Sequence, residues 1–95
     1  MRKVINYLIY LAKKNDNYAG VQIRLSTGES LDIEYSEIYN GDFKLNVSGV
    51  DLEKYNKDFN KFIDDEELYV FYDVNEFVDE FLKTILTIVD VDFYY

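Results

Sequence analysis

The stretch from residue 18 to residue 48, YAGVQIRLSTGESLDIEYSEIYNGDFKLNVS, decides the fold, because apolar and polar residues alternate through it in three runs. Alternation with a period of two places the apolar side chains on one face of a strand and the polar ones on the other. Short polar turns separate the runs, and the pair Asn40-Gly41 suits a two-residue hairpin turn. The stretch therefore predicts a three-stranded antiparallel meander with one face open to solvent.

A segment of helical periodicity precedes the meander. Between residues 2 and 14, apolar residues recur every three or four positions and gather on one side of a helix, with basic residues opposite. Lys13 and Lys14 lie in the last turn, where cations interact favourably with the helix dipole. The polar triplet at residues 15–17 then ends the helix. We expect an N-terminal helix over residues 2–14.

Two further helices are expected after the meander. Leu52, Tyr55 and Phe59 recur at helical spacing, which predicts a helix from about residue 50 to residue 63. Asp73 suits the N-cap of a third helix, with Glu76 placed to complete a capping box. The apolar residues that share one arc of this third helix are Val74, Phe77, Val78, Phe81, Leu82 and Ile85.

The two remaining segments, residues 68–72 and the C-terminal tail, are candidates for further strands. Residues 68–72 form either a short strand or an extended connector, and the tail from Val89 to Tyr95 again alternates with a period of two. The order of elements predicts one α+β domain over residues 1–95. It contains an N-terminal helix, a three-stranded antiparallel meander, two further helices and, if the tail pairs with the meander, a C-terminal edge strand.

The composition excludes several classes of catalytic site. The 95 residues include no cysteine and no histidine, which rules out thiol nucleophiles, Cys/His zinc sites and triads built on imidazole. The chain also lacks the Asp-x-Asp-x-Asp-Gly loop of calcium sites. Asp32, Asp42 and Lys44 imitate a metal-dependent nuclease pattern, but a net charge of −9 would repel the substrate. We expect no enzymatic activity, no cofactor and no specific metal site.

Acidic residues gather in the last third of the chain. Residues 1–28 carry a net charge of +4 and residues 29–95 a net charge of −13, with ten acids and one lysine between residues 64 and 92. Neighbouring carboxylates repel one another, and a cationic partner would remove that cost on binding. Their density also approaches that of a nucleic-acid strand, which carries one phosphate per roughly 3.4 Å of rise. The alternative is a solvated acidic surface that keeps a small protein in solution.

The candidate partner-binding residues are an acidic run, the two tyrosines that flank it and the acids of the third helix. Tyrosine is common in recognition surfaces, because it provides a broad contact area with little entropy to lose. The alternative for a tyrosine is burial in the core, which we expect for most of the phenylalanines. The predicted residues are Asp64, Asp65, Glu66, Glu67, Tyr69, Tyr72, Asp73, Glu76, Asp79 and Glu80. Acids interleaved with aromatic rings argue against direct binding of nucleic acid, which requires cations beside the rings.

The order of elements, together with these acids and tyrosines, resembles the small acidic anti-CRISPR proteins of phages. Some of those proteins occupy the basic cleft in which a CRISPR effector engages the PAM duplex, and so mimic DNA. The resemblance implies a phage-encoded inhibitor that blocks a CRISPR effector nuclease by acidic DNA mimicry and steric occlusion. PAM-reading arginines would then face the carboxylates that replace phosphates. These carboxylates belong to Asp64, Asp65, Glu66, Glu67, Asp73, Glu76, Asp79 and Glu80.

Two other functions fit the same pattern. An immunity protein or antitoxin would neutralise a basic nuclease toxin through the acids, and a phage structural or adaptor subunit would use the aromatic residues in assembly. In each case we expect a monomer or weak homodimer in the cytoplasm. The apolar run near the N-terminus contains two tyrosines and lacks a small-residue cleavage site, which is atypical of a signal peptide. No stretch approaches the roughly 20 apolar residues of a membrane span, so no membrane partner is expected.

Overall fold

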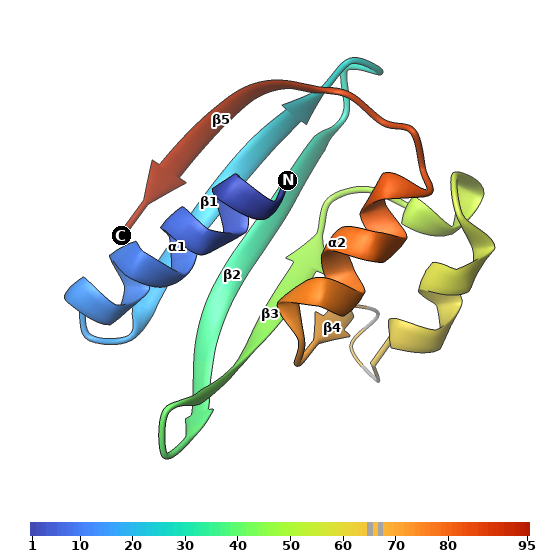
Figure 1. Ribbon diagram of the computed structural model, residues 1–95. Coiled ribbons are helices and arrows are strands. Elements are labelled where there is room, and N and C mark those ends of the chain that lie inside the picture. The colour runs from blue at the N-terminus through green and yellow to red at the C-terminus, as the bar shows by residue number, and fades with distance from the viewer. Residues whose placement is uncertain (65, 67) are drawn as a thin grey trace.

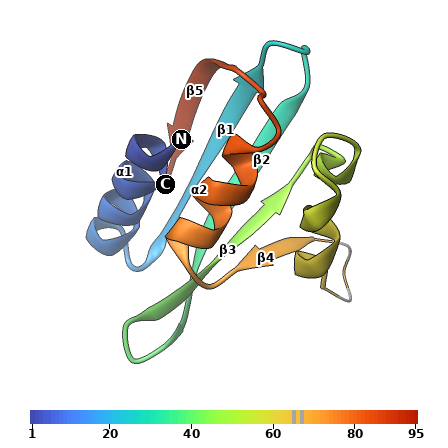
Figure 2. The ribbon, with the colours of Figure 1, turned by 45° about the vertical axis from the view of Figure 1, so that its right-hand side comes forward.

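A computed structural model describes residues 1–64, 66 and 68–95 as a sheet with helices on one face (Figure 1). The sheet is antiparallel and five-stranded, in the order β4-β3-β2-β1-β5. Helices α1 and α2 lie side by side over the same face, as Figure 2 also shows. The elements are α1 (Arg2–Lys14), β1 (Tyr18–Leu25), β2 (Ser30–Tyr39), β3 (Asp42–Ser48), the 3₁₀-helices η1 (Leu52–Lys54) and η2 (Lys57–Phe62), β4 (Tyr69–Phe71), α2 (Val74–Leu82) and β5 (Ile88–Tyr94). The α+β fold class is confirmed.

The predicted meander forms the centre of the sheet. β1 pairs with β2 and β2 pairs with β3, both antiparallel. Asn40 and Gly41 form the turn between β2 and β3 with φ angles of 47° and 87°, values that only a few residue types adopt readily. The sheet nevertheless has five strands rather than three. β4 joins beside β3, and β5 joins beside β1 at the opposite edge, as the alternation of the tail allowed.

The core lies between the sheet and the helices. The inward side chains of β1, β2 and β3 are almost fully buried, and the apolar sides of α1 and α2 cover them. An aromatic cluster closes the core under α2, where Phe71 contacts Phe59 and Phe77 edge to face. The buried positions include Ile5, Leu8, Val21, Ile23, Ile33, Tyr35, Leu45, Val47, Leu52, Phe59, Phe71, Phe77 and Phe81. This arrangement follows from the alternation in the strands, which leaves the sheet with one apolar face to bury.

The single helix predicted over residues 50–63 is wrong in its detail, because the segment forms two short 3₁₀-helices. Asn56 separates them in an extended conformation (φ −152°, ψ 108°). Its side-chain oxygen accepts a hydrogen bond from the backbone N–H of Asp58, and its amide nitrogen donates to the Glu80 carbonyl oxygen. Asparagine competes in this way with the helical hydrogen-bond ladder, so the apolar spacing alone predicts too long a helix.

The third predicted helix is confirmed at its start but ends earlier than its apolar arc. Asp73 caps α2 by accepting a hydrogen bond from the backbone N–H of Asn75. At the other end the Thr84 hydroxyl donates to the Phe81 carbonyl oxygen, and Ile85 adopts a φ of 55°. Ile85 is consequently 90% exposed rather than buried. Over the described residues, no helix is long and apolar enough to cross a membrane.

Alanine substitutions at two glycines, Gly28 and Gly49, test the packing of the turn after β3. Gly49 and Gly28 both have φ values near 90°, but only at Gly49 would a Cβ meet backbone, 2.5 Å from the Ser30 carbonyl oxygen. Gly28→Ala should cost about 1–2 kcal/mol from backbone strain alone. Gly49→Ala should cost at least about 1 kcal/mol more, because the backbone must also shift. Urea unfolding of both variants measures the difference, and equal losses would contradict this packing.

Candidate functional site

Tyr69 packs in the core and offers little contact area to a partner, although a small part of its surface lines a pocket beside Asp51 and Glu53. It is 6% exposed, and its ring packs against Phe59 with 5.5 Å between ring centroids. Its hydroxyl accepts a hydrogen bond from the backbone N–H of Leu52 and lies 3.4 Å from a carboxylate oxygen of Asp51. Burial raises the pKa of the Tyr69 hydroxyl, and the carboxylate of Glu53 adds to that effect. The position of β4 in the sheet turns this residue inward.

Glu80 is also removed from the candidate surface, because its carboxylate serves the fold. Its side chain is 15% exposed and forms an ion pair with Lys83, at 3.0 Å. The other carboxylate oxygen accepts a hydrogen bond from the Asn56 side chain, at 2.9 Å. Burial acts to raise the pKa of Glu80, but the hydrogen bonds from Lys83 and Asn56 outweigh burial and leave this pKa below its usual value. Glu80 thus ties α2 to the turn before η2.

The structure describes two of the four residues of the acidic run, Asp64 and Glu66. One carboxylate oxygen of Asp64 accepts hydrogen bonds from the backbone N–H groups of Glu66 and Leu68, each at 2.9 Å, so Asp64 closes the loop before β4. Glu66 is exposed. Asp65 and Glu67 lie outside the described residues.

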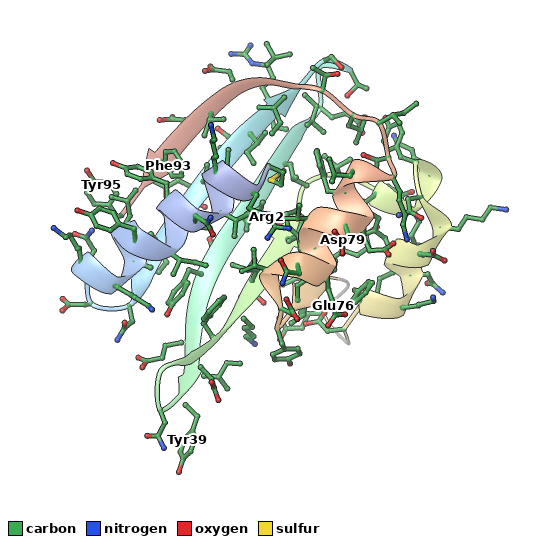
Figure 3. The ribbon with its side chains drawn as sticks, in the orientation of Figure 1. Arg2, Tyr39, Glu76, Asp79, Phe93 and Tyr95 are labelled. Carbon is green, nitrogen blue, oxygen red and sulfur yellow. The ribbon has the colours of Figure 1, made fainter. Side chains whose placement is uncertain are left out.

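The predicted residues that remain accessible together gather at the start of α2, and we call Tyr72, Asp73, Glu76 and Asp79 the α2 acidic surface. Tyr72 is 67% exposed, and the three acids are exposed as well. Figure 3 shows Glu76 and Asp79 on the side of α2 that faces away from the sheet. The three acids are spaced three positions apart, at residues 73, 76 and 79, so they lie toward one side of the helix.

Within residues 1–64, 66 and 68–95, no lysine or arginine forms an ion pair with a carboxylate of the α2 acidic surface. Of the nearby lysines, Lys61 contacts Asp58, and Lys83 contacts Glu80 although its charge also attracts Asp79. Arg2 approaches from α1 but donates its hydrogen bond to the Asn75 side-chain oxygen, an uncharged acceptor (Figure 3). The surface therefore retains mutual repulsion among its carboxylates, which an external cation would relieve.

The open face of the sheet holds further acids, on β5 and β2. Asp90 and Asp92 on β5 lie opposite Arg24 and Gln22 of β1. The nearby Tyr94 hydroxyl donates a 2.6 Å hydrogen bond to an Asp32 carboxylate oxygen, and burial together with this bond raises the pKa of Tyr94. The alternation of the tail predicts a strand, but it does not indicate that this strand pairs with β1 and places its acids beside those of the sheet. Among the described residues, no three acids converge to hold a metal ion.

Comparison of the chain with protein families, curated proteins and solved structures finds no significant match. The acids of α2 differ in their contacts: Glu80 forms an ion pair and a hydrogen bond that hold the fold, whereas Glu76 is exposed and forms no ion pair among the described residues.

That contrast predicts different effects of the same substitution. Glu80→Gln should destabilise the protein by about 1 kcal/mol, because it removes the charge from the acceptor of one part-buried and one exposed hydrogen bond. Glu76→Gln should change stability by only a few tenths of a kcal/mol, because the repulsion that it relieves and the attraction to the N-terminus of α2 that it removes act in opposite directions. Urea unfolding at pH 7 measures both, and equal effects would contradict the assignment.

The contribution of Glu80 to the free energy of unfolding should also depend on pH, and it should fall at acidic pH. Its folded pKa lies below the unfolded value of about 4.3, so its ionised form stabilises the fold above that value. The contribution is lost as the pH falls through the folded pKa. The difference in unfolding free energy between the wild type and Glu80→Gln should therefore shrink below about pH 4. A difference that stays constant from pH 7 to pH 3 would show that ionisation of Glu80 plays no part.

Proposed function

We propose that this protein is a non-enzymatic inhibitor that binds a basic nucleic-acid-binding protein and covers its nucleic-acid site. The observation that carries the proposal is the α2 acidic surface, whose exposed carboxylates have no ion-pair partner within the part of the chain that the structure describes. Asp73 also caps α2, but Glu76 and Asp79 have no ion-pair partner among these residues, and the repulsion among the three carboxylates acts against the fold. A partner rich in arginine would convert that repulsion into attraction.

The geometry of α2 suits occlusion of a phosphate-binding site. Successive acids at i and i+3 are separated by about 4.5 Å of helix rise, comparable with roughly 3.4 Å per phosphate along a DNA strand. A carboxylate accepts a bidentate hydrogen bond from an arginine much as a phosphate does. Tyr72 adds an exposed ring beside the acids, which can bury contact area at the centre of an interface.

A PAM-reading CRISPR effector is the partner that we propose, in line with the resemblance to phage anti-CRISPR proteins. Its arginines read the PAM duplex through the same bidentate geometry that carboxylates accept. A basic nuclease toxin, blocked by an immunity protein, presents similar chemistry. The two partners are distinguished by measurement against both classes.

The test is a DNA-binding assay with a panel of basic CRISPR effectors and nuclease toxins. Addition of the protein should abolish DNA binding by its target, and the affinity of the complex should fall steeply between about 50 and 200 mM salt. The double variant Glu76→Gln/Asp79→Asn should weaken inhibition at least about tenfold, because each desolvated charge pair at an interface is worth on the order of 1 kcal/mol or more.

A matched control removes the same charge elsewhere. Asp16→Asn/Glu34→Gln also changes the net charge by two, at exposed positions outside the α2 acidic surface, and should leave inhibition within about twofold of the wild type. If the two double variants weaken inhibition equally, the overall charge and not this surface is responsible. If no member of either class is inhibited, the proposal is wrong.

A further inference from the structure

The outer edge of β5 is the longest open strand edge that the structure describes. β5 runs over seven residues, Ile88–Tyr94, and pairs with β1; among the described residues, no strand lies on its other side. Figures 1 and 2 both show it along the margin of the sheet. The opposite edge differs, because β4 has three residues and Ile63 forms a bridge to Tyr69. An open edge presents backbone N–H and C=O groups that can pair with another strand.

Aromatic rings from α1 flank this edge on the inner side of the sheet. Tyr7 packs edge to face against Phe93 of β5, with 4.9 Å between ring centroids, and Tyr10 stacks on Tyr7 at 5.8 Å. Both tyrosines remain about half exposed, at 49% and 50%. Figure 3 shows Phe93 and Tyr95 beside α1. A strand added to β5 would therefore place its inward side chains next to partly exposed aromatic surface.

Acids flank the same edge on the outer side of the sheet. Asp90 and Asp92 are both exposed and alternate with Val91 and Phe93, which pack toward the core. Arg24 reaches one carboxylate oxygen of Asp90 at 3.4 Å, and the other oxygen accepts a hydrogen bond from the backbone N–H of Val91 at 3.0 Å. Both side chains of the ion pair are more than half exposed, so a further cation can still reach Asp90. The edge thus carries negative charge on one side and apolar surface on the other.

We propose that β5 binds an extended segment of a partner protein, in which lysine or arginine alternates with apolar residues, as a sixth strand of the sheet. The segment's backbone pairs with the open edge of β5. Its cations lie beside Asp90 and Asp92, as opposite charges do on neighbouring strands. Its apolar side chains lie against Tyr7 and Phe93. The charge pattern on β5 selects this occupant.

The same pattern disfavours a second copy of this chain. A two-fold pairing of β5 with itself over its whole length has its midpoint at Val91 and places Asp90 opposite Asp92 twice. Like charges directly opposite one another destabilise a strand pair, and such charges are a common protection against edge-to-edge association. The partner strand therefore comes from a protein with basic residues at alternate positions.

This site is separate from the α2 acidic surface. α2 contacts β4, and β4 and β5 form the two opposite edges of the sheet. Binding at β5 can therefore be tested whether or not the α2 acidic surface covers a nucleic-acid site.

The test uses a capped seven-residue peptide with lysine and valine in strict alternation, added to the ¹⁵N-labelled protein. We expect amide shift changes concentrated at residues 88–95 and in the part of α1 near Tyr7. A peptide of the same composition with its lysines in one block, and an alternating peptide with N-methylated backbone amides, should lose these changes, because neither can form the strand pairing. Sedimentation of the protein alone should show a monomer.

Paired variants separate the edge from general attraction to an acidic protein. Asp90→Asn/Asp92→Asn should weaken peptide binding about fivefold, from two cross-strand charge pairs of roughly 0.5 kcal/mol each. Glu76→Gln/Asp79→Asn removes the same charge from α2 and should leave the affinity within about twofold. Equal weakening by both variants, shift changes centred on α2, no binding, or a dimer formed through β5 would each overturn the proposal.

Discussion

The structure depends on one constraint, which is that the sheet has a single apolar face and this face must be covered. The inward residues of β1, β2 and β3 are almost completely buried, and a sheet of this kind is unstable until helices pack on it. α1 covers the β1 side and α2 covers the β4 side, with the aromatic cluster around Phe71 between α2 and the sheet. The positions of the exposed carboxylates on α2 and of the open edge of β5 follow from this packing.

The packing of α2 also sorts the carboxylates into two groups. Glu80 accepts a hydrogen bond from Asn56, in the turn before η2, and pairs with Lys83 at the end of α2, whereas Glu76 and Asp79 are exposed and form no ion pair among the described residues. Glu76 and Glu80 are four positions apart and share one side of α2, so their different environments come from Asn56, which contacts Glu80. The net charge of −9 therefore does not tell which carboxylates are paired within the fold and which are exposed without an ion pair.

The elements with strong local signals could be predicted from sequence. Asn40-Gly41 specifies a hairpin whatever surrounds it, and Asp73 caps α2 through its own backbone neighbours. The segment from residue 50 to residue 63 could not be predicted in the same way. Asn56 ends one turn and begins another partly by donating to the carbonyl of Glu80, a residue 24 positions away. Tyr69 likewise looked accessible beside its acids, and it is buried because β4 pairs with β3.

The sequence by itself determined the α+β class, the one-sided apolar sheet and the uneven distribution of charge, because periodicity and composition act through near neighbours along the chain. Only the tertiary structure decided which acids are exposed together and which strand is left at the edge. Those outcomes depend on contacts between distant segments, such as Glu80 with Asn56 and β5 with β1. A carboxylate becomes part of a binding surface only when the packing of such segments leaves it without a partner of its own.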